Sequence, residues 1–176
     1  MAIKKYFAIE DNTITNAFEE NLNTRGTGSN MGQSDILEVF SIYGQQSTSS
    51  AELSRALIQF DVGSISADRD SGDIPASGSV SFFLKLYNAE HTKTLPRNYN
   101  LEANAISVNW EEGNGLDMDN YTDLTHNFTG SNWVHASGNP AAASLSDAID
   151  TSAVSAGDKF TLRVPTSAGG DGVLYT

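Results

Sequence analysis

The chain has 176 residues, no cysteine and a formal net charge of −12, from 10 basic and 22 acidic residues. This length fits one domain that can bury a core without covalent cross-links, and the lack of cysteine excludes disulfides and thiolate metal sites. The negative charge disfavours nucleic acid and anionic membranes as partners. The segment Met1–Asp11 lacks the apolar run of a signal peptide, and no apolar run reaches the roughly 20 residues of a membrane helix. We therefore expect synthesis in the cytoplasm without secretion by a signal peptide.

The predicted regular structure consists of short strands separated by loops rich in Gly, Ser, Asn and Asp. From Arg55 to Asp61 large apolar residues alternate with polar or small ones, and Val80–Leu86 is apolar enough to be covered on both sides. The predicted strands are 6–9, 36–43, 53–62, 80–88, 99–110 and 158–165. Their predicted core residues are Val39, Ile42, Leu57, Phe60, Phe83, Leu84, Leu86 and Leu162.

Helix signals are weak throughout the chain. The stretch 67–73 is predicted to be an acidic loop, residues 144–149 could form one helical turn, and no helix of ten residues is expected. The sequence thus predicts an all-β protein, an antiparallel β-sandwich forming a single domain over residues 1–176, with core strands within 6–123 and 158–165.

A long irregular region, 111–157, interrupts this pattern. Loops of this length in compact domains are usually functional or take part in interfaces. We therefore expect this region to contact a partner.

Several motifs resemble the DNRLRE-type jelly-roll domains of bacterial surface proteins and virion proteins. They are the strand Arg55–Asp61, the strand Ser79–Tyr87 and the turn Trp110-Glu111-Glu112-Gly113. The opening Asn12–Phe18 and the loop Gly28–Gly32 are similar to structural proteins of marine tailed phages.

This resemblance implies a jelly-roll sandwich without catalysis. It also implies a place on a phage virion, as a capsid decoration, tail or fibre component that contacts virion proteins or assembles with itself as an oligomer. The family's later strands are mostly missing after residue 123. Either another subunit completes the sandwich, or the chain is part of a larger protein.

Two acidic clusters are candidate Ca²⁺ sites. Asp117, Asp119 and Asp123 provide hard oxygen ligands at short spacing, although glycine and glutamate do not fall where an EF-hand needs them. A second, weaker cluster is Asp68, Asp70 and Asp73. For both clusters a solvated acidic loop remains the alternative to a cation site.

The candidate contact residues are aromatic. Trp133, Tyr121 and Phe128 lie in the long loop region, where flat rings suit either a protein partner or the face of a sugar. Trp110, at the end of a predicted strand, is assigned to the core instead.

The sequence contains no catalytic motif that competes with a structural function. The three histidines lie at no motif spacing relative to an acid or a nucleophile, and no Gly-x-Ser-x-Gly or His-Glu-x-x-His occurs. The chain is therefore expected not to be an enzyme, although a polysaccharide hydrolase using paired carboxylates is a third, weaker possibility. The main alternative to a virion protein is a carbohydrate-binding module of a cell-surface protein or enzyme, with polysaccharide as its partner.

Overall fold

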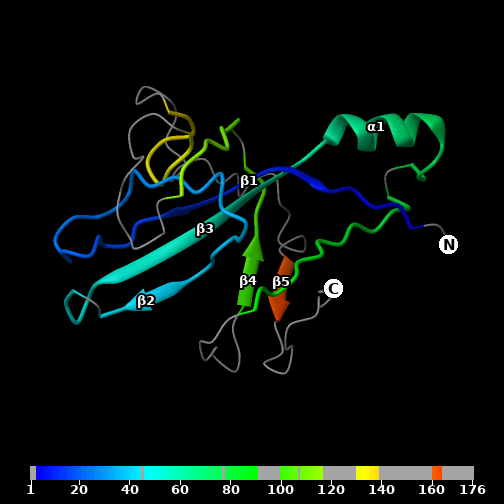
Figure 1. Cartoon of the computed structure of the whole chain (residues 1–176). Coiled ribbons are helices and arrows are strands. Elements are labelled where there is room, and N and C mark those ends of the chain that lie inside the picture. The colour runs from blue at the N-terminus through cyan, green and yellow to red at the C-terminus, as the bar shows by residue number, and fades with distance from the viewer. Residues whose placement is uncertain are drawn as a thin grey trace. The chain divides into compact units, whose positions relative to one another are not determined.

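The computed structural model describes residues 3–44, 46–76, 78–90, 100–106, 108–116, 130–138 and 160–163. Its strands are β1 (Ala8–Thr15), β2 (Ser41–Tyr43), β3 (Ala51–Phe60), β4 (Asn100–Ala103) and β5 (Phe160–Arg163), and its helix is α1 (Val62–Ser71) (Figure 1). The regular structure in these ranges is thus mostly strand, as the all-β prediction requires. No helix in them is long and apolar enough to cross a membrane.

The chain divides into two compact units. Unit 1 comprises residues 1–65 and 106–149, and unit 2 comprises residues 66–105 and 150–176. The helix α1 spans the boundary between them.

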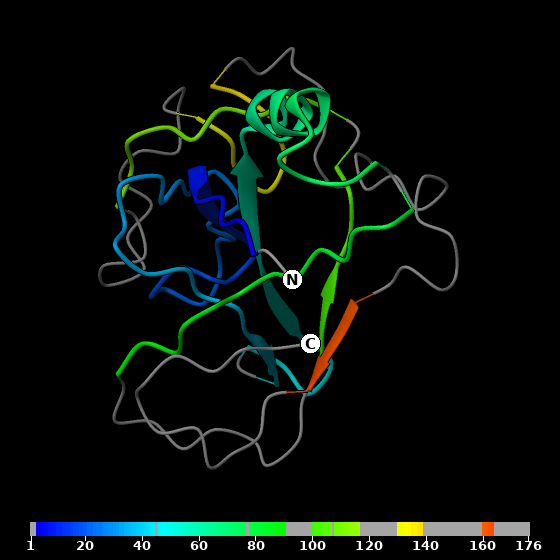
Figure 2. The same cartoon turned by 90° about the vertical axis from the view of Figure 1, so that its right-hand side faces the viewer.

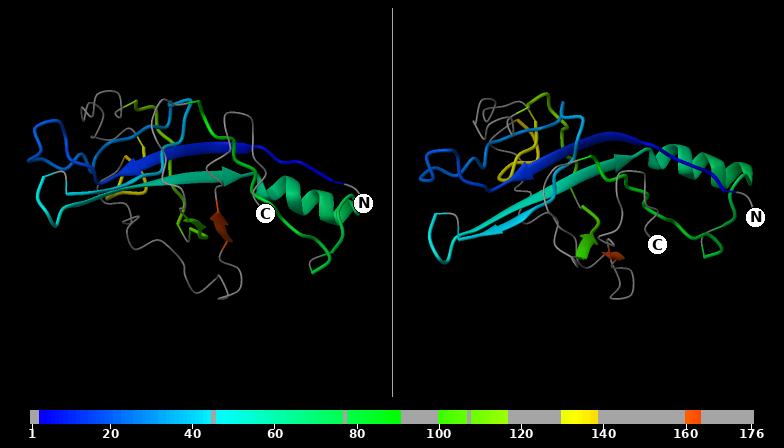
Figure 3. Two further views of the ribbon diagram at one scale, coloured as in Figure 1. Left: turned by 90° about the horizontal axis from the view of Figure 1, so that it is seen from below. Right: turned by 60° about the horizontal axis from the view of Figure 1, so that its bottom comes forward.

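Unit 1 contains a three-stranded antiparallel sheet in the order β1-β3-β2. The strands β1 and β3 pair from Ala8 opposite Phe60 to Thr15 opposite Ser54, with a bulge between Ala8 and Glu10. They run alongside each other over this length in both views of Figure 3. Both strands are long because β-branched or apolar side chains recur along them and suit a pleated surface packed on one side.

The apolar core lies on one face of this sheet. Residues opposite each other in the register share a face, so Ile14 and Arg55 lie on the same side as Leu57. Ile14 and Leu57 are buried against Trp110 and Ala136 from the loops that cover this face. The prediction that Leu57 and Trp110 belong to the core is therefore confirmed.

The opposite face of the sheet carries the hydroxyl groups of Thr13 and Ser54, and the chain crosses it before β2. The Glu38 amide donates to Thr13 Oγ1 (3.0 Å) and the Phe40 amide donates to Ser54 Oγ (2.7 Å). These amides bond to side-chain hydroxyls instead of a strand ladder. For this reason the strand predicted at 36–43 forms only at Ser41–Tyr43, and Val39 lies outside it, 52% exposed.

The helix α1 contradicts the prediction that no helix of ten residues would form. Its start is capped by Asp61, whose Oδ1 accepts from the Ser64 amide (3.2 Å) and whose Oδ2 accepts from Ser64 Oγ (2.5 Å). These hydrogen bonds lower the pKa of Asp61. Gly72, with a φ of 82°, follows the last turn as glycine commonly does after a helix. The predicted acidic loop at 67–73 is therefore mostly the end of a helix.

The prediction of a strand at 80–88 is also wrong. These residues form no named strand, and Phe83 and Tyr87 are 61% and 67% exposed. Leu84 and Leu86 are half-buried. An apolar run supplies side chains for a sheet but not a neighbouring strand to accept its backbone hydrogen bonds.

The strands predicted at 99–110 and 158–165 form in shortened versions. In unit 2, β4 pairs antiparallel with β5, from Asn100 opposite Arg163 to Ala103 opposite Phe160, so Leu162 lies in a strand as predicted. Ile42 and Phe60 also lie in strands, but both are only half-buried. The strands predicted at 6–9 and 53–62 correspond to β1 and β3 with shifted ends.

Candidate functional site

The best-defined polar site in unit 1 is built around Asn12 on β1. Its side chain is fully buried, and Nδ2 donates to Ser131 O (2.9 Å) and to Ser131 Oγ (2.8 Å). Its Oδ1 accepts from the Met31 amide (2.8 Å). One side chain of the sheet thereby fixes two loops that are far apart in the sequence.

A second buried asparagine, Asn30, ties the same loops to a third segment. Its Nδ2 donates to Glu112 O (2.7 Å) and Ser131 O (2.8 Å), and its Oδ1 accepts from the Gly115 amide (2.8 Å). We call Asn12, Asn30, Glu112, Gly115 and Ser131 the loop junction. Buried amides are costly unless all their polar atoms are paired, so this set favours one arrangement of the three loops.

Three glycines let the loop backbones approach closely at the junction. A Cβ on Gly32 would lie 2.7 Å from Gly113 O and nearer still to Glu112 O. A Cβ on Gly130 would lie 2.7 Å from the Gly113 nitrogen, and Gly130 and Gly113 have φ values of 137° and 81°. Only glycine fits such contacts without displacing the backbone.

Backbone hydrogen bonds complete the assembly of the loops. The Glu111 amide donates to Ala136 O (2.9 Å), the Ser131 amide to Glu111 O (2.8 Å) and the Trp133 amide to Thr27 O (3.1 Å). Figure 2 shows these segments gathered in the part of unit 1 beside the sheet. Residues 111–116 and 130–138 contain no helix or strand, as predicted for the long irregular region, yet they are firmly attached to the sheet.

Two carboxylates meet beside β1 at the edge of the junction. The Asp11 amide donates to Glu112 Oε1 (2.8 Å). This hydrogen bond satisfies a backbone N–H group of the edge strand β1. Partial burial raises the pKa of Asp11, and repulsion from Glu112 raises it further. Ionised Asp11 therefore destabilises the folded state slightly.

Asp11→Asn should stabilise the protein at neutral pH. The folded state binds a proton more tightly than the unfolded state, so the penalty from Asp11 is present above its folded pKa and disappears as pH falls toward the ordinary value of 3.8. Because the group is largely solvated, we expect a gain of less than about 1 kcal/mol. Urea unfolding at about pH 7 and about pH 4 measures the gain in the free energy of unfolding. An equal gain at the two pH values would contradict a raised pKa of Asp11.

The predicted contact residue Trp133 packs on the core. It lies half-buried against the core cluster, and the Arg55 guanidinium lies over its ring, 4.5 Å from the centroid. One face of the ring is therefore occupied by a cation from β3. Tyr121 and Phe128, the other predicted contact residues, lie outside the described residues.

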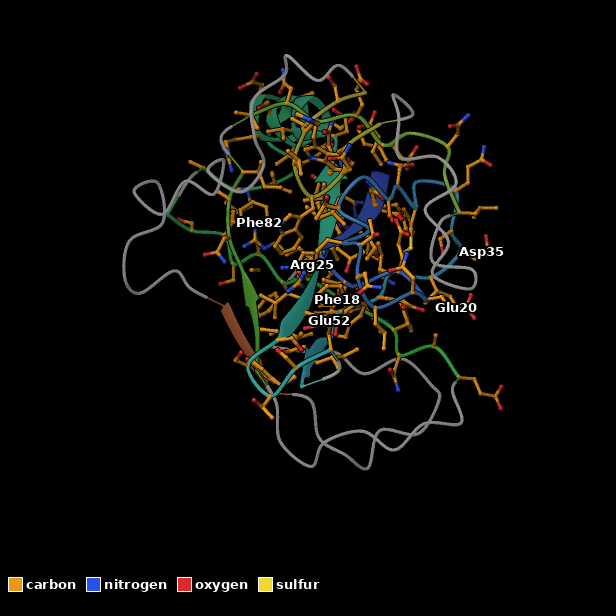
Figure 4. All side chains as sticks on the ribbon, turned by 90° about the vertical axis from the view of Figure 1, so that its left-hand side faces the viewer. Phe18, Glu20, Arg25, Asp35, Glu52 and Phe82 are labelled. Carbon is orange, nitrogen blue, oxygen red and sulfur yellow. The ribbon has the colours of Figure 1, made fainter. Side chains whose placement is uncertain are left out.

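A small hairpin at residues 17–26 extends from the far end of β1. Glu52, buried on β3, accepts from the Phe18 amide through Oε2 (2.9 Å), and the Arg25 guanidinium stacks on the Phe18 ring at 3.9 Å (Figure 4). Arg25 also donates to Asn16 O and Ala51 O, each at 2.8 Å. Glu52 Oε1 is buried and has no hydrogen-bond partner among the residues that the structure describes. These contacts attach the hairpin to the sheet.

The predicted calcium ligands are not brought together in the part of the chain that the structure describes. Asp68 and Asp70 lie on α1 and Asp73 follows it, and no group of three or more His, Asp or Glu residues in the described ranges could hold a metal ion. Asp117, Asp119 and Asp123 lie outside those ranges, so calcium binding there stays a prediction.

Searches of protein-family models, curated proteins and solved structures find no match to this chain. The junction itself offers hydrogen bonds and shape but no arrangement of nucleophile and base among its residues. Its chemistry is suited to holding loops in place.

Sequence reasoning missed both asparagines of the junction. Asn12 and Asn30 both stand in segments noted only for their resemblance to known families, the opening of the chain and the loop Gly28–Gly32. One signal was present: Asn12 belongs to the same strand face as Ile14, where a polar residue requires buried partners.

Proposed function

We propose that this chain is a non-enzymatic structural protein of a phage virion, a capsid decoration, tail or fibre component that acts through contacts with other subunits. The jelly-roll sandwich implied by the DNRLRE resemblance belongs to this proposal, as do the virion location and the oligomeric state. The sequence motifs of the chain and the architecture of unit 1 each support this proposal.

The observation that carries the proposal is a set of exposed apolar side chains on the edge strand β2 and in the segment that leads into it. Ile36, Val39 and Tyr43 are 48%, 52% and 74% exposed, and β2 is an outer strand of the three-stranded sheet. Exposed apolar groups beside an open strand edge favour pairing with another chain. The strongly negative charge keeps such a protein soluble before it assembles.

The loop junction supports the same interpretation. A surface that binds a partner without rearrangement loses less conformational entropy on association. Loops fixed by Asn12 and Asn30 meet this condition, although their backbone is irregular.

The carbohydrate-binding alternative receives less support from Trp133. A sugar platform needs an open aromatic face, whereas the Arg55 guanidinium covers one face of this ring. A polysaccharide would have to use the other face or other residues.

The double variant Val39→Ser/Tyr43→Ser should abolish association while leaving the melting temperature nearly unchanged, because both side chains are exposed. Light scattering over a range of concentrations, together with binding to purified virions, measures the association. Val62→Ser is the matched control, since Val62 lies on α1 and is a valine even more exposed than Val39, 68% against 52%.

Wild-type protein that stays monomeric, does not bind virions and binds polysaccharide on a glycan array would contradict the proposal. Loss of that binding in Trp133→Ala would then favour the carbohydrate-binding module.

A further inference from the structure

The single Asn-Gly dipeptide of the chain is Asn114-Gly115, and its glycine belongs to the loop junction. Asparagine followed by glycine is the most reactive context for spontaneous deamidation, because glycine has no side chain to hinder attack by its own backbone nitrogen. The Asn114 side chain is exposed to water, whereas Gly115 is buried.

The reaction requires the Gly115 nitrogen to lose its proton and attack Cγ of Asn114. A carbon–nitrogen bond forms, ammonia leaves with the transferred proton, and a cyclic imide remains. Water then opens the imide at either carbonyl and leaves aspartate or isoaspartate at position 114. The net change is one water consumed and one ammonia released.

The structure blocks the first step at the attacking nitrogen. The Gly115 N–H donates to Asn30 Oδ1 at 2.8 Å in a buried setting, and Gly115 O accepts from the Gln33 amide at 3.2 Å. Deprotonation would remove a buried hydrogen bond and place an anionic nitrogen against the lone pairs of Oδ1. Bonds at both ends of the residue also oppose the rotation that brings nitrogen to Cγ.

We propose that Asn114 is a latent deamidation site, kept unreactive in the folded chain by the hydrogen bond from the Gly115 amide to Asn30. Opening of the junction releases the site, and the product is permanent. It adds a negative charge beside Glu111 and Glu112, so deamidated protein is a chemical record of junction opening. This inference does not depend on the proposed function.

Peptide mapping by mass spectrometry, with isoaspartate quantified, tests the proposal during incubation at mildly alkaline pH. Wild-type protein in buffer should deamidate at position 114 at least about tenfold more slowly than the same protein in urea. Asn30→Ala should raise the native rate toward the urea rate, because it removes the acceptor of the Gly115 amide.

Asn12→Ala is the matched control. It removes other hydrogen bonds of the junction but leaves the Asn30 acceptor of the Gly115 amide in place, so its native deamidation rate should rise much less than that of Asn30→Ala. If Asn30→Ala does not fold, hydrogen exchange in the wild type replaces it, and the Gly115 amide should be among the protected ones. Three results would overturn the proposal. They are deamidation of the native wild type as fast as in urea, an unprotected Gly115 amide, and equal deamidation rates in folded Asn30→Ala and Asn12→Ala.

Discussion

Asn12→Ala is expected to lower the free energy of unfolding by about 3 kcal/mol. The substitution leaves the Met31 amide and Ser131 Oγ without the partner that Asn12 supplies, at a position with no access to water, while Ser131 O keeps its bond from Asn30. Each buried polar atom that loses its partner costs about 1–3 kcal/mol, and relaxation of the loops recovers part of that. Urea unfolding followed by tryptophan fluorescence measures the change.

Asn21→Ala provides the comparison at an exposed asparagine. Asn21 Oδ1 accepts from the Asn23 and Thr24 amides, at 2.7 and 2.9 Å, but the hairpin tip is open to water. Water can replace those bonds, so the cost should stay below about 1 kcal/mol. Equal losses in the two variants would mean that the buried network around Asn12 adds nothing to stability.

Gly32→Ala should destabilise the protein by about 2–4 kcal/mol. The new methyl group would lie against the backbone carbonyl oxygens of Glu112 and Gly113, which cannot rotate away as a side chain could. The 31–33 loop must therefore shift and weaken the hydrogen bonds of Asn30. The free energy of unfolding measures the loss, and hydrogen exchange at Gly115 should rise with it.

Gly72→Ala separates this steric effect from backbone strain. Gly72 has a φ of 82°, which is unfavourable for alanine, but no atom lies within 4 Å of the added Cβ. Strain alone should cost about 1–2 kcal/mol. A loss at Gly32 no larger than this would refute the close approach of the loop backbones.

Local patterning determined much of unit 1. The alternation from Arg55 to Asp61 predicted β3 and the burial of Leu57, and the position of Trp110 predicted its place in the core. The lack of regular signals after Glu111 predicted irregular structure, which holds for residues 111–116 and 130–138. Each of these features depends mainly on the side chains within a few positions of the residue concerned.

Other features depended on partners distant in the sequence. Asn12 and Ser131 are 119 positions apart, and Asn30 and Gly115 are 85 apart, so no local pattern identifies their contact. The segment 36–40 has strand-forming residues, but the hydroxyls of Thr13 and Ser54 take its amides. Similarly, Val80–Leu86 has the composition of a buried strand and forms none.

The sequence by itself therefore determined that the regular structure is mostly strand, that the segment around Arg55–Phe60 forms a strand and that Leu57 is buried, because side-chain periodicity is a local property. Only the tertiary structure decided which backbone groups are paired and which asparagines fix the loops. A buried donor is satisfied by any acceptor that the fold brings within about 3 Å, and that acceptor can come from any part of the chain.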